Sequence, residues 1–202
     1  GYFFDHHWQF GRRTCAAQAD VSNEADVARA CAEAEAALGP VDILLNNAGH
    51  NLRKPLTEFT VDEFDSLHAV HVRGTFLFCR ALAPGMRERR RGAILNVASM
   101  LGLVAAPNVA PYAAAKAALV QVTRVLALEL APYGVRVNAL APGYIDTPLT
   151  RQHPEATRAR ITNTTPLGRF GEARELIGPA LFLVSPASSF VTGSVLVVDG
   201  GW

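Results

Sequence analysis

The chain has 202 residues, half of them apolar, and its 19 Lys and Arg nearly balance its 18 Asp and Glu. This length suits one domain with a sizeable core, and the apolar content argues against disorder. The near-zero net charge gives no electrostatic case for binding nucleic acid or an anionic membrane. No apolar run reaches membrane-spanning length, and nothing at the start reads as a signal peptide.

The cysteines and the N-terminal residues give further indications of the class of protein. Cys15, Cys31 and Cys79 are odd in number and lie in or beside apolar segments, which is typical of reduced thiols in a cytoplasmic protein. The adjacent pair His6 and His7 has no third spaced ligand, so we expect no metal site. Residues 1–11 are aromatic-rich without periodicity, and we interpret them as an atypical segment ahead of one domain at 12–202.

Strand and helix signals alternate from Arg12 onward. The predicted strands are Thr14 to Asp20, Val41 to Leu45, Ala93 to Ala98, Val135 to Leu140 and Ser194 to Val198. The predicted helices are Glu24 to Leu38 (capped by Ser22 or Asn23), a long helix opened by the capping box at Thr60 and running to about Glu88, Pro111 to Tyr133, and Glu172 to Leu183. The segment Arg151 to Thr165 is polar and weakly helical, like a mobile flap.

Continuous apolar strands separated by helices predict a parallel sheet covered on both faces. Ligands of such folds bind beyond the carboxyl ends of the strands. The informative polar and turn residues fall at those ends, where Asp20, Asn47, Ser99 and the pair Pro142-Gly143 each follow a predicted strand.

A tyrosine and a lysine share one face of the third predicted helix. Tyr112 and Lys116 are one helical turn apart. A phenol is a poor base at neutral pH, but a fixed cation about 6 Å away would favour the phenolate and lower the tyrosine pKa. Such an acid or base needs a second donor to hold the carbonyl oxygen, and Ser99 could provide it.

Four features occur together and in order: Asn-Asn-Ala-Gly after a strand, Ser99, the Tyr112-x-x-x-Lys116 motif, and Pro142-Gly143. With them the chain resembles the short-chain dehydrogenase/reductase family from about Arg12 to Trp202. The run from Asn46 to Pro55 looks like the gluconate 5-dehydrogenase-like subgroup. The resemblance implies a Rossmann-type, doubly wound α/β fold. It also implies hydride transfer between NAD or NADP and an alcohol or carbonyl, possibly of a sugar acid or polyol, in a homodimer or homotetramer.

The resemblance also implies residue roles. Tyr112 matches the acid/base tyrosine, Lys116 the lysine that binds the nicotinamide ribose and lowers the tyrosine pKa, and Ser99 the serine that orients the carbonyl. The positions that match cofactor-binding residues, besides Tyr112 and Lys116, are Asp20, Val21, Asn47, Ala48, Gly49, Pro142, Gly143, Ile145 and Thr147. The flap closes over substrate in the family.

The chain departs from the family pattern before Arg12. The glycine-rich turn that binds the pyrophosphate, the first two strands and the helix between them would precede that residue. We therefore expect the first βαβ portion to be lacking and the chain to bind a nicotinamide cofactor poorly. The alternative to an active dehydrogenase is a non-catalytic fragment that acts only through association with other subunits. Cofactor binding separates the two hypotheses.

A second departure is His71, which stands where the family has an asparagine, the fourth catalytic position, that holds a water linking the lysine to solvent. Either the relay uses only the backbone carbonyl of His71, which we favour, or the imidazole joins it and adds a titration between about pH 6 and 7. Asn138 is interpreted as a structural hydrogen-bonding residue. Arg53 and Lys54 are either exposed cations or contacts for an acidic substrate.

Overall fold

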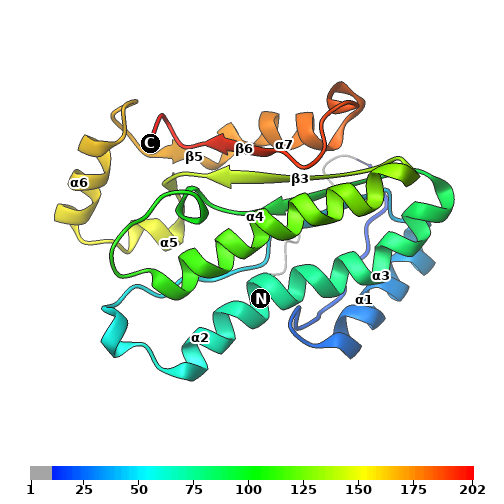
Figure 1. Ribbon diagram of the computed structural model, residues 1–202, viewed down its shortest axis with the longest axis horizontal. Coiled ribbons are helices and arrows are strands. Elements are labelled where there is room, and N and C mark those ends of the chain that lie inside the picture. The colour runs from blue at the N-terminus through cyan, green and yellow to red at the C-terminus, as the bar shows by residue number, and fades with distance from the viewer. Residues whose placement is uncertain (1–10) are drawn as a thin grey trace.

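The computed structural model describes residues 11–202, in which strands alternate with helices (Figure 1). The strands are β1 (Ile43–Asn46), β2 (Gly92–Val97), β3 (Val135–Pro142), β4 (Ile145–Asp146), β5 (Gly171–Glu172) and β6 (Val195–Val198). The α-helices are α1 (Glu24–Leu38), α2 (Val61–His68), α3 (Gly74–Arg89), α4 (Ala110–Leu130), α5 (Pro148–Arg151), α6 (Glu155–Thr164) and α7 (Ile177–Val184). A π-helical turn at Ala69–Arg73 joins α2 to α3, and short 3₁₀ turns occur at Leu56–Glu58, Met100–Gly102, Ala131–Tyr133, Ala173–Leu176 and Pro186–Ser188.

The main sheet has the strand order β1-β2-β3-β6, and all its pairs are parallel. Parallel neighbours need long crossovers, and helices provide them here. β4 and β5 form a separate parallel pair beyond the end of β3. The expected Rossmann-type α/β fold is therefore confirmed.

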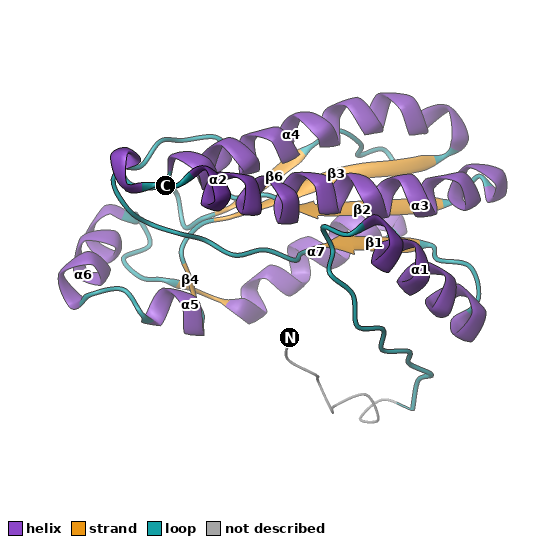
Figure 2. Ribbon diagram, turned by 90° about the horizontal axis from the view of Figure 1, so that it is seen from below, coloured by secondary structure: helices purple, strands orange, loops and turns teal. Residues whose placement is uncertain are grey.

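Helices cover both faces of the main sheet. α3 and α4 lie side by side on one face, and α7 packs on the other (Figures 1 and 2). Because neighbouring side chains of a strand point to opposite faces, Ile94 belongs to the core beneath α3 and α4, whereas Leu95 packs against Leu183 of α7. None of the helices within residues 11–202 is long and apolar enough to cross a bilayer.

The predicted strand at Thr14 to Asp20 is wrong. This segment is irregular and runs toward α1, where the Cys15 thiol contacts the Glu33 carbonyl and the Gln18 carbonyl accepts from Arg29. In Figure 2 the loop before α1 trails away from the sheet. No described strand lies between this segment and β1, so its backbone has no ladder to join. Asp20 consequently does not end a strand.

β1 is the last strand on its side of the described sheet. Its side chains alternate, with Leu44 buried and its neighbours Ile43 and Leu45 51% and 54% exposed. β1 therefore exposes Ile43 and Leu45 on the sheet face opposite Leu44, and no described strand pairs with the backbone groups of its outer edge.

Local signals set most helix boundaries as predicted. The Asn23 side chain caps α1, and Thr60 and Glu63 form the capping box of α2. Gly134, with φ of 71°, ends the turn after α4 in the left-handed conformation that glycine adopts at low cost. The single long helix predicted from Thr60 to Glu88 is instead interrupted by the π-helical turn, a feature often found at functional sites.

A buried chain of polar side chains ties β1, β2 and α4 together. Asn46 Nδ2 donates to Asn96 Oδ1 at 2.9 Å, and Asn96 Nδ2 donates to Thr123 Oγ1 at 2.9 Å. The Thr123 hydroxyl in turn donates to the Leu119 carbonyl at 2.7 Å. Asn96 and Thr123 are both fully buried. Because water cannot reach their polar groups, these hydrogen bonds satisfy donors and acceptors that would otherwise stay unpaired.

The Thr123→Val variant should test this chain. Valine keeps the shape but leaves the buried Asn96 amide without its acceptor, which should lower the free energy of unfolding by about 1–3 kcal/mol. Chemical denaturation of both proteins measures the difference. Thr57→Val, at an exposed position, is the matched control and should change little. Equal stability of the Thr123 and Thr57 variants would show that this series of buried hydrogen bonds contributes nothing to the free energy of unfolding.

Candidate active site

The carboxyl ends of β1, β2 and β3 and the first turns of α4 surround a cavity of about 430 Å³, called here the strand-end cavity. It lies where the topology of a parallel sheet places ligand sites. Eight residues predicted for catalysis or cofactor binding line it: Asn47, Gly49, His71, Ser99, Tyr112, Lys116, Pro142 and Gly143.

Ser99 is positioned by the turn that follows β2. Its backbone is extended, and its hydroxyl oxygen accepts from the Leu101 N–H at 3.1 Å, which caps the 3₁₀ turn. The next glycine, Gly102, packs directly against the backbone of Lys116, since a Cβ there would lie 2.8 Å from the Lys116 carbonyl atoms. This close approach sets α4 beside the Ser99 turn.

Lys116 is buried at 4% exposure, and its ammonium donates to the Val97 carbonyl at 2.7 Å. Its Nζ lies 5.7 Å from the centre of the Tyr112 ring, so the expected pairing on one helix face is present. Burial disfavours the charged amine and lowers the pKa of Lys116 to about 8.

The expectation of a lowered tyrosine pKa is not met. Burial raises the pKa of Tyr112 above its usual value, because it disfavours the phenolate. A hydrogen bond with the Ser99 side chain and the charge of Arg53 act in the opposite direction and are smaller. The phenol is therefore protonated at neutral pH.

His71 lies on the π-helical turn, is 2% exposed and meets the Tyr112 ring edge-on at 5.4 Å between ring centres. Its Nε2 donates to the His50 carbonyl at 2.7 Å, and its buried Nδ1 has no hydrogen-bond partner within the described residues. Burial, followed by the nearby Lys116 charge, lowers the pKa of His71 to about 4. The imidazole therefore stays neutral between pH 6 and 7, where the side-chain relay would require a titration.

The His71 ring packs directly against Gly49. A Cβ at Gly49 would lie 2.3 Å from His71 Cε1, far inside normal contact. The Gly49 backbone is not in the left-handed region, so this side chain contact alone excludes larger residues.

The positions matched to cofactor binding fall into two groups around the sheet end. Asn47, Pro142 and Gly143 line the strand-end cavity, and a Cβ at Gly143 would lie 2.6 Å from Asp199. Val21, Asn47 and Ala48 line a second cavity, of about 170 Å³, beside β1.

Three further matched positions lie outside both cavities. Ile145 forms β4, Thr147 caps α5, and the Asp20 carboxylate accepts from the Ser22 backbone and hydroxyl. These bonds from Ser22 lower the pKa of Asp20.

The strand-end cavity is lined by positive charge. Its charged lining residues are Arg53 and Lys116, and no Asp or Glu occurs among its described lining residues. Lys54 is instead paired with Glu63 at 2.6 Å. Arg53 also lowers the pKa of His153 across the cavity, after burial of that ring. Of the two cations that could meet an acidic substrate, only Arg53 reaches the cavity.

Sequence reasoning missed several lining residues: His50, Asn51, Tyr144, Thr150, Gln152 and His153. Tyr144 directly follows the recognised Pro142-Gly143 pair, which could have indicated it. His153 lies in the polar segment predicted as a flap, which the structure folds into α5 and α6.

Two other predictions concern residues away from the cavity. Asn138 is structural as predicted, because its amide donates to Val191 O and accepts from Ser194 N. His6 and His7 lie outside the described residues, and the described part of the chain holds no metal-binding cluster.

The family model described as Enoyl-(Acyl carrier protein) reductase matches residues 7–202. The 5-keto-D-gluconate 5-reductase of Escherichia coli K12 is 40% identical over 195 residues, covering 96% of this chain and 77% of that protein. An inactive 2-(S)-hydroxypropyl-CoM dehydrogenase 2 of Xanthobacter autotrophicus is 44% identical, over 91% of this chain and 82% of its own length.

Solved structures agree with these relatives. A gluconate 5-dehydrogenase from Burkholderia cenocepacia, in complex with NADP and tartrate, superposes with a TM-score of 0.87 at 42% identity, over 90% of this chain and 72% of that one. The chain belongs to the short-chain dehydrogenase/reductase family of NAD(P)-dependent oxidoreductases.

The His71 environment predicts a pH-dependent stability. Its pKa falls from 6.5 to about 4 on folding, so as the pH drops the unfolded chain binds the proton first and the folded state loses stability. The loss should develop between about pH 6.5 and 4 and reach about 3 kcal/mol, at roughly 1.4 kcal/mol per pKa unit. Denaturation curves at several pH values measure it.

The His71→Asn variant should remove this part of the pH dependence, whatever its stability at pH 7. His68→Asn, on the adjoining turn, is the matched control and should retain it. A steep loss of stability between pH 6.5 and 4 that persists in His71→Asn would contradict the assignment.

Gly49→Ala should lower the free energy of unfolding by about 1–3 kcal/mol through overpacking against His71. In the His71→Ala background the same change should cost much less, because the contact atoms are gone. Gly178→Ala, where a Cβ meets nothing within 4 Å, is the control and should be neutral or stabilising. Equal costs of Gly49→Ala in both backgrounds would refute the contact.

Proposed function

We propose that the chain interconverts a ketone and a secondary alcohol on a hydroxy acid, with Ser99, Tyr112 and Lys116 as catalytic residues and His71 as their positioning partner. The observation that carries this proposal is the convergence of Ser99, Tyr112 and Lys116 in one cavity, which Arg53 also lines. A nicotinamide cofactor, when bound, supplies or accepts the hydride at the reacting carbon.

The residues present fit the nicotinamide end of such a cofactor. Gly143 packs against Asp199, where a Cβ would lie 2.6 Å away, and the buried Lys116 lines the same cavity, where its ammonium would contact a ribose. Asn47 and Gly49 line the same cavity, with Ile145 and Thr147 just beyond Gly143. Val21 and Ala48 would bound the adenosine side, and Asp20 the turn next to it.

Tyr112 supplies the proton in this proposal. In the direction of reduction, the phenol O–H donates its proton to the substrate oxygen while the Ser99 hydroxyl donates a hydrogen bond to the same oxygen. The raised pKa of Tyr112 keeps that proton in place at neutral pH. The Lys116 charge then stabilises the phenolate left behind, since the amine is buried nearby.

The charge around the cavity supports an acidic substrate. Arg53 has no carboxylate partner within the described residues, unlike Lys54, and its charge reaches both Tyr112 and His153. A substrate carboxylate beside Arg53 would neutralise it. The similarity to proteins named for gluconates, and to one bound to the hydroxy acid tartrate, favours a sugar acid over an apolar alcohol.

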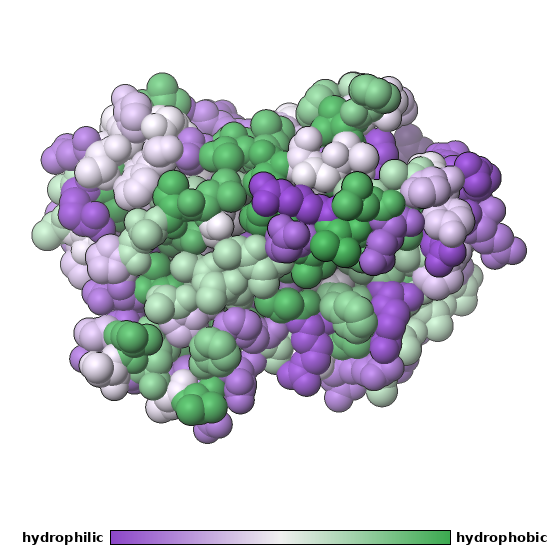
Figure 3. Space-filling model, viewed as in Figure 1, coloured by the Kyte–Doolittle hydropathy of each residue, from purple (hydrophilic) through white to green (hydrophobic). Residues whose placement is uncertain are grey.

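Two further points accompany this proposal. The unpaired thiols Cys15, Cys31 and Cys79 support a cytoplasmic location. The face made by α3 and α4 carries exposed apolar side chains, Phe76 and Leu128 among them, and supports assembly into a homodimer or homotetramer. Figure 3 shows apolar patches interspersed with polar ones on the side viewed.

A second candidate function is a non-catalytic subunit that acts only through association. The 44% identity to a relative named as inactive and the exposed α3 and α4 side chains favour it. Titration of the protein with NADP and NAD separates the candidates, because only the dehydrogenase needs a cofactor.

Tyr112→Phe should lower turnover of 5-keto-D-gluconate with reduced cofactor by about 100- to 10,000-fold, because the ring stays but the transferable proton is lost. Steady-state kinetics measure the loss. Tyr133→Phe, at the far end of α4, is the matched control and should keep wild-type turnover. Retention of a tenth of the activity by Tyr112→Phe would remove this residue from the mechanism.

A further inference from the structure

Tyr144 is a second tyrosine of the strand-end cavity. It directly follows Pro142 and Gly143 at the end of β3 and lines the cavity together with Ser99 and Tyr112. Both tyrosines therefore belong to the wall of one cavity.

The Tyr144 hydroxyl is buried without a partner. The residue is 8% exposed, and its oxygen has no hydrogen-bond partner within the described residues. Leaving such a group unpaired costs free energy, and phenylalanine would fill the same apolar surroundings without that cost. A hydroxyl kept at such a position is suited to bind a ligand.

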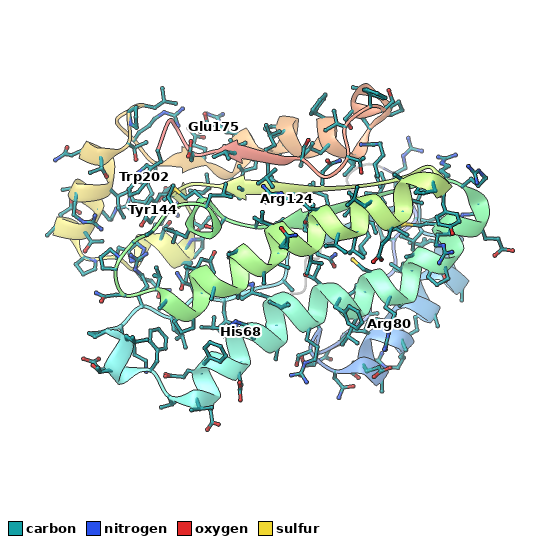
Figure 4. The ribbon with its side chains drawn as sticks, in the orientation of Figure 1. His68, Arg80, Arg124, Tyr144, Glu175 and Trp202 are labelled. Carbon is teal, nitrogen blue, oxygen red and sulfur yellow. The ribbon has the colours of Figure 1, made fainter. Side chains whose placement is uncertain are left out.

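The ring cannot turn this hydroxyl toward bulk water. It is held edge-on by Phe170 and Trp202, at 6.0 and 5.8 Å between ring centres, and the Tyr144 carbonyl accepts from Gly171 N at 2.9 Å. Figure 4 shows Tyr144 and Trp202 close together near the end of β3. Packing thus fixes the hydroxyl before any substrate arrives.

Asn51, in the loop after β1, adds a second unpaired group to the site. Its Oδ1 is buried without a hydrogen-bond partner within the described residues, and the residue follows β1 and lines the same cavity. An amide oxygen accepts a hydrogen bond, and a phenol can donate or accept one. Neither group is used by the proton transfer from Tyr112.

We propose that Tyr144 and Asn51 are specificity-determining residues that hydrogen-bond substrate hydroxyl groups beside the reacting carbon. The substrate is therefore a polyhydroxylated acid, whose hydroxyls satisfy both buried groups, and a ketone that carries only apolar groups is a poor substrate. This inference rests on the proposed function and deepens it. A site built to pair substrate hydroxyls discriminates against analogues that lack them, because its own polar groups are then left unpaired.

The test compares wild type, Tyr144→Phe and the control Tyr133→Phe with 5-keto-D-gluconate and with cyclopentanone. Tyr144→Phe should lower kcat/KM for the hydroxylated ketone by about 3- to 10-fold, the range for one lost hydrogen bond, and leave that for cyclopentanone unchanged. Asn51→Ala should likewise lower the ratio of kcat/KM for 5-keto-D-gluconate to kcat/KM for cyclopentanone. Without ligand, the Tm of Tyr144→Phe should equal or exceed that of wild type, because an unpaired buried hydroxyl is removed.

A fall in Tm with equal losses on both substrates would assign Tyr144 a structural role and overturn the inference. An unchanged ratio of the two substrates would also overturn it, while leaving the proposed function standing. If wild type turns over neither ketone, the proposed function fails. The increase in Tm caused by gluconate then tests the further inference separately. An increase that is lost in Tyr144→Phe supports hydroxyl binding by Tyr144, and the lack of any increase in wild type overturns this inference.

Discussion

The bond between the Lys116 ammonium and the Val97 carbonyl joins the two elements on which the site depends. Val97 ends β2, and Lys116 lies in the second turn of α4, so the bond fixes the helix over the end of the sheet. Gly102 lets the helix approach the turn after β2, and Ser99 begins that turn. With the helix placed in this way, Tyr112 lines the same cavity as Ser99.

The neutral state of its ring explains how a histidine can stand at position 71. Burial, and after it the nearby Lys116 charge, disfavours the protonated imidazole and lowers the pKa of His71 to about 4. The neutral ring keeps one N–H donor, used on the His50 carbonyl, and one acceptor, Nδ1. An asparagine amide also offers both a donor and an acceptor, although it has one N–H more, and the larger imidazole demands room that Gly49 provides.

Much of the fold and of the site could be predicted from local patterns. The strand signals near Ala93 and Val135 and the caps at Asn23 and Thr60 depend on neighbouring residues, so they survive in the folded chain. The prediction of a strand at Thr14 to Asp20 failed because a strand needs a neighbouring strand to pair with, and a local sequence pattern does not show whether one is present. The prediction of a lowered Tyr112 pKa failed for a related reason. Helix spacing predicts the distance between Tyr112 and Lys116 but not the burial of both groups, and burial raises the Tyr112 pKa. Tyr144 and Asn51 lie beside or within recognised sequence motifs, but only the structure shows that each has a buried polar atom without a hydrogen-bond partner among the described residues.

The π-helical turn at Ala69–Arg73 has a consequence for insertions and deletions in this chain. A π-helical turn holds one residue more than the corresponding α-helical turn. Deleting one residue there would let α2 and α3 merge into a regular helix and would rotate α2 by about 100° about the axis of α3. The apolar residues of α2, Leu67 among them, would then leave the core while α3 stayed in place. The length of this segment is thus as constrained as its sequence, and homologous chains of different length should differ elsewhere, in loops.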